Sequence, residues 1–428
     1  MNHFLVRGAR FGVLGAMLAL AAFAQAQSGS FVLTNAKIVR GDGSVLEKGS
    51  ILISEGKIAA VGANIDSKGA PAIDLSGKVI YPGFIDSFAR GGLKIPDAPE
   101  TSPAPAVNEN PPITFWNGNR RGIRSEIDAS KNLDPESLGV TWHEQGIASA
   151  NLVGPVGLFS GSTALFHTGG KPESALWKAE IAQTVGFAGG GGPGGGGGYG
   201  GSIMGRFALI RQMFFDAQYE AEKPADKKDP SVANLVAAVE GKMPVMFSAN
   251  SEREIQRALM LADEFNLKPI IVGGREAWRL ADELKKHKAS VILDANLGNE
   301  PTVSERGDGP PKEVQEERRE AWRDAADYAS RLQKAGVPFA FSGGNARSGF
   351  LTNVRKHLEY GLDIKTLVAA LTKNAAQILG VGKEAGDIAS GMIADLTIMD
   401  GDLEKAESKV VMMVVKGERI DLKKEEGQ

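Results

Sequence analysis

The stretch "VIYPGFIDSFARGG", residues 79–92, decides how this chain is interpreted. Its first half is apolar and looks like the end of a buried strand that enters a catalytic loop. Its second half continues with Phe88 and Arg90 and lacks the side chains that a metal-dependent loop needs. The stretch therefore raises the question whether the loop after this strand can still bind a metal ion.

Composition bounds the answer. The chain has 428 residues, 42% of them hydrophobic, which is enough for one large core or for a large and a small domain. A formal net charge of -3 provides no basic field and argues against a nucleic-acid partner. The absence of cysteine excludes disulfides, thiolate metal sites and a thiol nucleophile.

The N-terminus has the layout of a targeting segment. Arg7 and Arg10 precede the short apolar run "FGVLGAMLALAAFA", and small residues follow at Ala24 and Ala26. This pattern predicts a secretory signal peptide over residues 1–26, and the alternative is an uncleaved anchor helix. We therefore expect a secreted protein, periplasmic in a Gram-negative host, with no membrane span after the signal is removed.

Both ends of the mature chain are rich in strand patterns. Residues 31–62 alternate apolar and polar positions around Gly-containing turns, and "ADLTIMDGD" with "KVVMMVVKGERI" repeat this pattern near the C-terminus. Two β-rich ends around a long middle predict a small composite domain built from both termini. Residues 27–80 and 388–428 would form it.

The middle of the chain, residues 81–387, alternates strand and helix patterns. Strands are predicted at 243–249, 268–274, 289–294 and 337–344, and helices follow them, including one over 312–335 and one from Asp363 to Gly380. Ser251 and Glu254 fit a capping box at the start of another helix. This repetition favours parallel strands with crossover helices, in a (β/α)8 barrel or a doubly wound sheet.

Three segments are predicted to be loops. Residues 188–201, "AGGGGPGGGGGYGG", are of low complexity, and their glycines lack the ordered spacing of a dinucleotide-binding fingerprint. Residues 93–120 are rich in Pro and Asn, and residues 295–311 are similar.

The ends of the chain carry a specific resemblance. "LTNAKIVRGDGSVLEKGSILISEGKIAAVG", "IDLSGKVIYPGFID" and "LTKNAAQILGVGKEAGDIASGMIADLTIMDGD" resemble the amidohydrolase superfamily, in its secreted, imidazolonepropionase-like branch. "GVTWHEQGIASANLVGP", "PVMFSANSEREIQRALMLADEFNLKPIIVGGREAWRLADEL" and "GVPFAFSGGN" match in the same order. The resemblance covers essentially the whole mature chain. It implies an α/β fold, a (β/α)8 TIM barrel with a small composite β-sandwich from both chain ends.

The resemblance also implies a metal-dependent hydrolase site, which this sequence does not retain. The family uses zinc or another divalent metal, held by a His-x-His pair, two further His and an Asp at the carboxyl ends of barrel strands. No cofactor is predicted here, because all five ligand positions are substituted. They align with Phe88, Arg90, Ser248, Gly273 and Gly343.

Counting histidines leads to the same interpretation without an alignment. The chain has five, of which His3 leaves with the signal peptide. We expect His287 and His357 to be polar helix residues and His143 to be structural. His167 is the one with a claim to a pocket, and one imidazole cannot build the metal centre.

Other residues near the former site complete the candidate set. Asp86 and Asn345 are expected to line the old pocket or to close strand ends by hydrogen bonds to the backbone. A Ser-His-Asp arrangement would need Ser248 or Ser342 beside His167, and no local pattern indicates it. Arg90 is either a buried substitute for the metal charge, with Asp86 as its partner, or a side chain in solvent.

Two functional hypotheses follow from different classes. The first is a non-catalytic pseudoenzyme that binds a small molecule, forms a homo-oligomer or pairs with an active amidohydrolase relative. The second is a hydrolase that acts on carbon–nitrogen bonds other than protein peptide bonds, as the resemblance implies.

Overall fold

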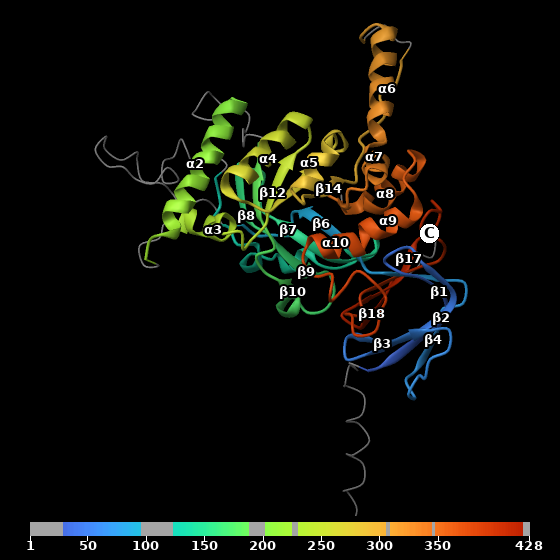
Figure 1. Cartoon of the computed structure of the whole chain (residues 1–428). Coiled ribbons are helices and arrows are strands. Elements are labelled where there is room, and N and C mark those ends of the chain that lie inside the picture. The colour runs from blue at the N-terminus through green and yellow to red at the C-terminus, as the bar shows by residue number, and fades with distance from the viewer. Residues whose placement is uncertain are drawn as a thin grey trace, which may run out of the picture.

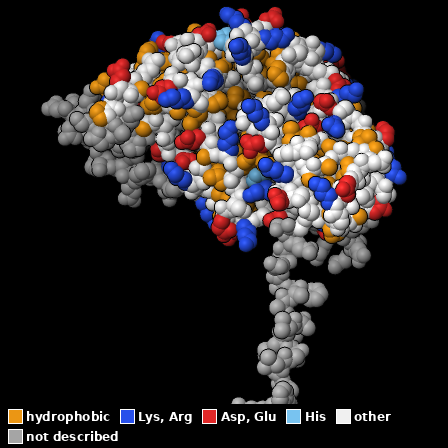
Figure 2. Space-filling view, turned by 60° about the horizontal axis from the view of Figure 1, so that its bottom comes forward, with side chains coloured by type: hydrophobic (Ala, Val, Ile, Leu, Met, Phe, Trp, Pro, Cys, Tyr) orange, Lys and Arg blue, Asp and Glu red, His pale blue; other side chains and the backbone are white. Residues whose placement is uncertain are grey.

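A computed structural model describes residues 29–95, 123–187, 202–224, 230–304, 309–344 and 347–422. The predicted signal peptide, the Gly-rich segment 188–201 and the candidate residue Asn345 lie outside these ranges. Within them, no helix is long and apolar enough to cross a bilayer. Figure 2 shows that Lys, Arg, Asp and Glu side chains are interspersed over the face that it presents.

Strands from both ends of the chain share one eight-stranded sheet, drawn in blue and red in Figure 1. The order is β18-β17-β16-β5-β1-β2-β3, and β4 pairs with β1. Its strands are β1 (Phe31–Val39), β2 (Val45–Ser54), β3 (Lys57–Gly62), β4 (Ala72–Asp74), β5 (Val79–Pro82), β16 (Leu396–Met399), β17 (Val410–Val415) and β18 (Glu418–Asp421).

This sheet joins the two ends through matched apolar residues. β5 pairs in parallel with β1 and antiparallel with β16, so that Ile80 lies opposite both Ile38 and Ile398. All three belong to one buried apolar cluster. The predicted meeting of the two chain ends is therefore confirmed at the level of the sheet, because the same buried face is made of residues from both ends.

Two further sheets form the centre of the molecule. One has the order β10-β9-β7-β6, and the other has the order β15-β14-β13-β12-β11-β8. Their strands are β6 (Phe84–Arg90), β7 (Ile147–Val153), β8 (Phe159–Ser162), β9 (Ala164–His167), β10 (Leu176–Lys178), β11 (Gln183–Gly186), β12 (Val245–Ala249), β13 (Pro269–Gly273), β14 (Ser290–Asp294) and β15 (Phe339–Ser342).

The central sheets are mostly parallel, as predicted, with one exception. β6 pairs in parallel with β7, and β11 to β15 pair in parallel in sequence order. β8 and β9 are separated only by Thr163, and each runs antiparallel to its partner, β11 or β7. The chain therefore passes from one central sheet to the other within a single extended segment. The expectation of parallel strands alone is wrong at this point.

Helices lie around the central sheets in Figure 1. The α-helices are α1 (Val140–His143), α2 (Ile203–Ala221), α3 (Pro230–Val239), α4 (Glu252–Phe265), α5 (Ala281–Lys286), α6 (Lys312–Ala326), α7 (Tyr328–Ala335), α8 (Phe350–Glu359), α9 (Ile364–Leu371) and α10 (Lys373–Ile378). Short 3-10 helices are η2 (Ala129–Lys131), η3 (Pro135–Ser137), η4 (Pro172–Ser174), η6 (Ala277–Leu280) and η7 (Arg347–Gly349).

The capping box of α4 is confirmed: the Ser251 hydroxyl accepts a hydrogen bond from the Glu254 backbone N–H, and the Glu254 carboxylate accepts one from the Ser251 backbone N–H. Asp363 caps α9 as predicted. The two long helices predicted from the sequence are each divided, at Asp327 and at Thr372.

The division at Asp327 has a packing reason. Tyr328 is buried and donates a hydrogen bond to the Asp294 carbonyl at 2.6 Å, so α7 is held against β14. α6 is made mainly of charged residues, and a continuous helix would force these into the same core. In Figure 1, α6 projects from the body while α7 lies within it.

Candidate functional site

The sequence-predicted site residues lie mainly along one edge, where the parallel strands end. Ser248 pairs across the sheet with Val272, and Gly273 pairs with Leu293. Asp294 then pairs with Ser342 at the end of β15. A bridge between Ala89 and Gly344 brings the end of β6 beside β15. Most of the candidate set is therefore gathered at the edge that carries catalytic groups in parallel α/β folds.

Asp86 is fully buried and holds two backbone groups at this edge. Its Oδ1 accepts hydrogen bonds from the Gly343 N–H at 3.0 Å and from the Phe88 N–H at 3.2 Å. The Phe88 N–H lies on β6, the strand that also contains Asp86, and the Gly343 N–H directly follows β15. Asp86 therefore joins the two strands by hydrogen bonding to the backbone, as one of its two expected roles required.

Ser342 adds a second connection at this seam, the junction between β6 and the end of β15. Its hydroxyl donates to the Phe88 carbonyl at 2.6 Å and accepts from the Gly344 N–H at 3.0 Å. The Arg90 N–H donates to the Gly344 carbonyl at 2.9 Å. With both hydroxyl roles used, Ser342 is a structural group and not an activated nucleophile.

Phe88, which the resemblance aligns with the first position of the family's histidine pair, is a buried ring. Its side chain is 4% exposed and belongs to an apolar cluster that also contains Val272, Met246 and Ile292. These residues come from β12, β13 and β14, so the cluster lies between the strands of both central sheets. An apolar cluster at this place stabilises the fold and offers no ligand atom to a cation.

Arg90, which the resemblance aligns with the second position of the pair, is half-buried. Its Nη1 lies 3.5 Å from the Gly154 carbonyl, and its guanidinium carbon lies 5.2 Å from the centre of the Phe88 ring. Burial lowers the pKa of the guanidinium. Both expectations for Arg90, an ion pair with Asp86 and a side chain in solvent, therefore differ from the observed contacts. The guanidinium contacts a backbone carbonyl and the face of an aromatic ring.

Gly273 and Gly343 have no room for a ligand side chain. A Cβ at Gly343 would lie 2.7 Å from the Asp86 carboxylate, and one at Gly273 would lie 2.5 Å from the Asn250 side-chain oxygen. The φ of Gly273 is also +97°, in the region that disfavours residues with a Cβ. Ser248 is half-buried at the end of β12.

His167 lies apart from this group. Its Nδ1 is 3.4 Å from the Asp395 Oδ2, and its ring stacks on Trp177 with centroids 4.6 Å apart. The backbone carbonyl of Asp395 accepts a hydrogen bond from the Gly83 N–H, beside the eight-stranded sheet. The claim of His167 to the predicted site is not supported by these contacts, because antiparallel β9 ends near the start of β6.

The other histidines have structural contacts. The His143 ring hydrogen bonds to the Thr168 carbonyl at 3.0 Å, in agreement with its expected role. His287 lies 3.0 Å from the Asp263 carboxylate. The expectation of a polar helix position is wrong for His357, which is 1% exposed and donates to the Ala295 carbonyl at 3.1 Å. Burial lowers its pKa to about 4, because charge is costly in this core.

A divalent metal therefore does not fit the residues at the strand ends. At the positions that the resemblance assigns to ligands, the chain has a phenyl ring, a guanidinium, a hydroxyl and two glycines in place of imidazole and carboxylate donors. Over the described residues, no group of three or more His, Asp and Glu side chains could hold a metal ion.

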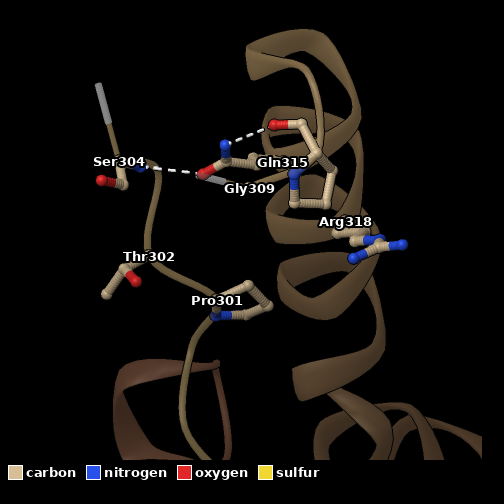
Figure 3. A pocket seen from close by; sticks show the side chains of 7 residues that line it. Pro301, Thr302, Ser304, Gly309, Gln315 and Arg318 are labelled. Carbon is tan, nitrogen blue, oxygen red and sulfur yellow. Dashed lines mark hydrogen bonds between the residues drawn. The ribbon is translucent and has the colours of Figure 1, made fainter. Parts of the chain in front are cut away.

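A separate pocket was not anticipated from the sequence. It has a volume of about 360 Å³ and lies between α6 and the segment that precedes it, as Figure 3 shows. The Gln315 amide spans it, accepting from the Ser304 N–H at 2.8 Å and donating to the Pro310 carbonyl at 2.7 Å. Among the described residues that line the pocket, the charged one is Arg318.

Comparisons with known proteins agree on the fold. Residues 310–420 match a family model described as "Amidohydrolase family". An amidohydrolase from Thermotoga maritima MSB8 superposes with a TM-score of 0.72 at 21% identity, covering 91% of this chain and 99% of that one. No curated protein matches the sequence.

Two further solved structures are more distant. A prolidase complexed with N-methylphosphonate-L-proline has a TM-score of 0.51 at 18% identity, covering 92% of this chain and 100% of its own. A molinate hydrolase has a TM-score of 0.51 at 12% identity, covering 92% and 95%. At these identities the likeness is one of fold.

Proposed function

We propose that the chain is an exported, non-catalytic member of the amidohydrolase superfamily with a degenerate metal site, which binds a small molecule or pairs with an active relative. The family model that matches residues 310–420 and the fold shared with a solved amidohydrolase support this membership. The observation that carries the proposal is that residues at the predicted ligand positions make structural contacts. Phe88 packs in an apolar cluster, and the N–H of Gly343 is held by Asp86. Export is proposed from the signal-like pattern of residues 1–26.

The proposal includes a (β/α)8 barrel as the scaffold of the binding site. Its support is that β8 and β9 form one extended segment shared by both central sheets, and that β6 and β15 are bridged at Ala89 and Gly344. The ring would then consist of β6, β7, β8 with β9, β11, β12, β13, β14 and β15. The eight-stranded sheet is proposed as the core of the composite β-sandwich.

The purified mature protein should retain less than one equivalent of zinc, iron or manganese. The strand ends supply too few donor atoms to hold a divalent ion through dialysis. Elemental analysis after purification without chelator measures this. A full equivalent that survives dialysis would contradict a degenerate site.

Restoring the histidine pair alone should not restore a metal centre. In a Phe88→His and Arg90→His double variant, Gly273 and Gly343 still lack ligand atoms, and neither backbone has space for them. We expect no metal-stimulated hydrolysis of amide substrates above that of the natural protein. Metal-dependent activity in the double variant would show that the ligand positions are assigned wrongly.

A hydrolase of carbon–nitrogen bonds other than peptide bonds is the second candidate. The observation in its favour is the set of hydrolases among the similar structures, which includes an amidohydrolase. Turnover of amide or cyclic amide substrates by the natural protein, unchanged by chelator, would support this candidate over the first.

A further inference from the structure

Arg90 combines burial with the absence of a charged partner. The guanidinium is half-buried at the end of β6, and its contacts are the Gly154 carbonyl at 3.5 Å and the Phe88 ring at 5.2 Å. Over the part of the chain that the structure describes, no carboxylate forms an ion pair with it, and desolvation is the one influence on its pKa. The Asp86 and Asp294 side chains, at the same edge, accept hydrogen bonds from backbone N–H groups.

Such an arginine is unfavourable for the fold by itself. Removing part of a guanidinium from water costs free energy. A hydrogen bond to a carbonyl at 3.5 Å is weak and offsets little of this cost. Residues that oppose stability in this way are found mainly at functional sites, where a ligand completes the set of contacts. Arg90 lies at the edge of the strands where ligands bind in this class of fold.

The surroundings restrict the charge and shape of that ligand. A single guanidinium balances one negative charge, and its planar fork matches the two oxygens of a carboxylate. Phe88, Val153 and Val272 are buried in one apolar cluster, and the Arg90 guanidinium lies over the Phe88 ring. A monoanion matches the single charge of the Arg90 guanidinium, and an organic body contacts the apolar residues beside it.

We propose that Arg90 anchors a binding site for small organic monocarboxylates at the carboxyl ends of β6 and β7. The proposal rests on the non-catalytic binding function proposed above and names its ligand class. The carboxylate forms the bidentate pair with the guanidinium, and the apolar part of the ligand lies toward Phe88.

Binding of phenylacetate and of its neutral analogue phenylacetamide, measured by calorimetry, tests the proposal. The natural protein should bind phenylacetate at least about tenfold more tightly than phenylacetamide, because only the carboxylate forms the charged pair. Arg90→Met should weaken phenylacetate binding about tenfold and leave phenylacetamide binding nearly unchanged. Arg90→Lys, which keeps the charge without the fork, should fall between the two.

Arg253→Met is the matched control, because Arg253 is an exposed arginine on α4. It should leave both affinities unchanged. The proposal is overturned if the natural protein does not prefer the carboxylate, or if Arg90→Met and Arg90→Lys both bind phenylacetate within about twofold of the natural protein. Circular dichroism of each variant confirms that it is folded.

Repeating the phenylacetate titration after treatment with a chelator separates this inference from the proposed function. Phenylacetate binding that survives chelator and is lost in Arg90→Met supports both. Binding that is lost on chelation belongs to a metal and contradicts the degenerate site as well. A metal-free protein that shows no preference for the carboxylate contradicts the Arg90 site alone.

Discussion

The natural protein should lose about 2 kcal/mol of stability between neutral pH and pH 5, and the His357→Gln variant should not show this loss. The pKa of this imidazole is lowered from 6.5 to about 4 in the folded state, because the ring is buried on α8. Between these values the unfolded chain binds a proton that the folded chain does not. Stability is therefore present above pH 6.5 and falls as the pH decreases toward 4.

Urea unfolding at pH 7 and at pH 5 measures the difference. Glutamine can keep the hydrogen bond to the Ala295 carbonyl without titrating. His143, whose pKa burial also lowers, is present in both proteins and cancels in the comparison. His287→Gln, at a helix end, should not reduce the loss at pH 5. Equal pH dependence in the natural protein and in His357→Gln would refute the effect of burial.

The Asp86→Ala variant should lose about 3 kcal/mol of stability without any change in metal content. The substitution leaves the N–H groups of Phe88 and Gly343 without their acceptor in a site that is fully buried. Because one N–H lies on β6 and the other follows β15, the loss should open the seam between the two strands. A candidate binding residue is thus predicted to have a structural role.

Two variants separate loss of the acceptor from loss of any polar group at this edge. Asp86→Asn retains an acceptor oxygen and should lose less stability than Asp86→Ala. Ser248→Ala, at the end of β12, should change stability by no more than about 0.5 kcal/mol. If Ser248→Ala is as destabilising as Asp86→Ala in denaturant unfolding, the hydrogen bonds at the seam are not the cause.

Several features could be predicted from the sequence because they are local or countable. The capping box at Ser251 depends on residues three positions apart, and the strands β12 to β15 follow from short apolar runs. The histidine count and the absence of cysteine limit the donor atoms whatever the fold is. The resemblance of the ordered motifs indicated the superfamily.

Only the tertiary structure decided which groups meet. Periodicity places His357 on a helix, but its burial depends on α8 packing against Phe341 and Tyr328. The antiparallel β8 and β9 separate His167 from the strand ends and bring it to Asp395. The sequence does not determine whether Arg90 is buried, because its half-buried position depends on the pairing of β6 with β7, which brings the Gly154 carbonyl, 64 residues away, beside it. Contacts at such separations follow from how the elements pack, which local pattern does not encode.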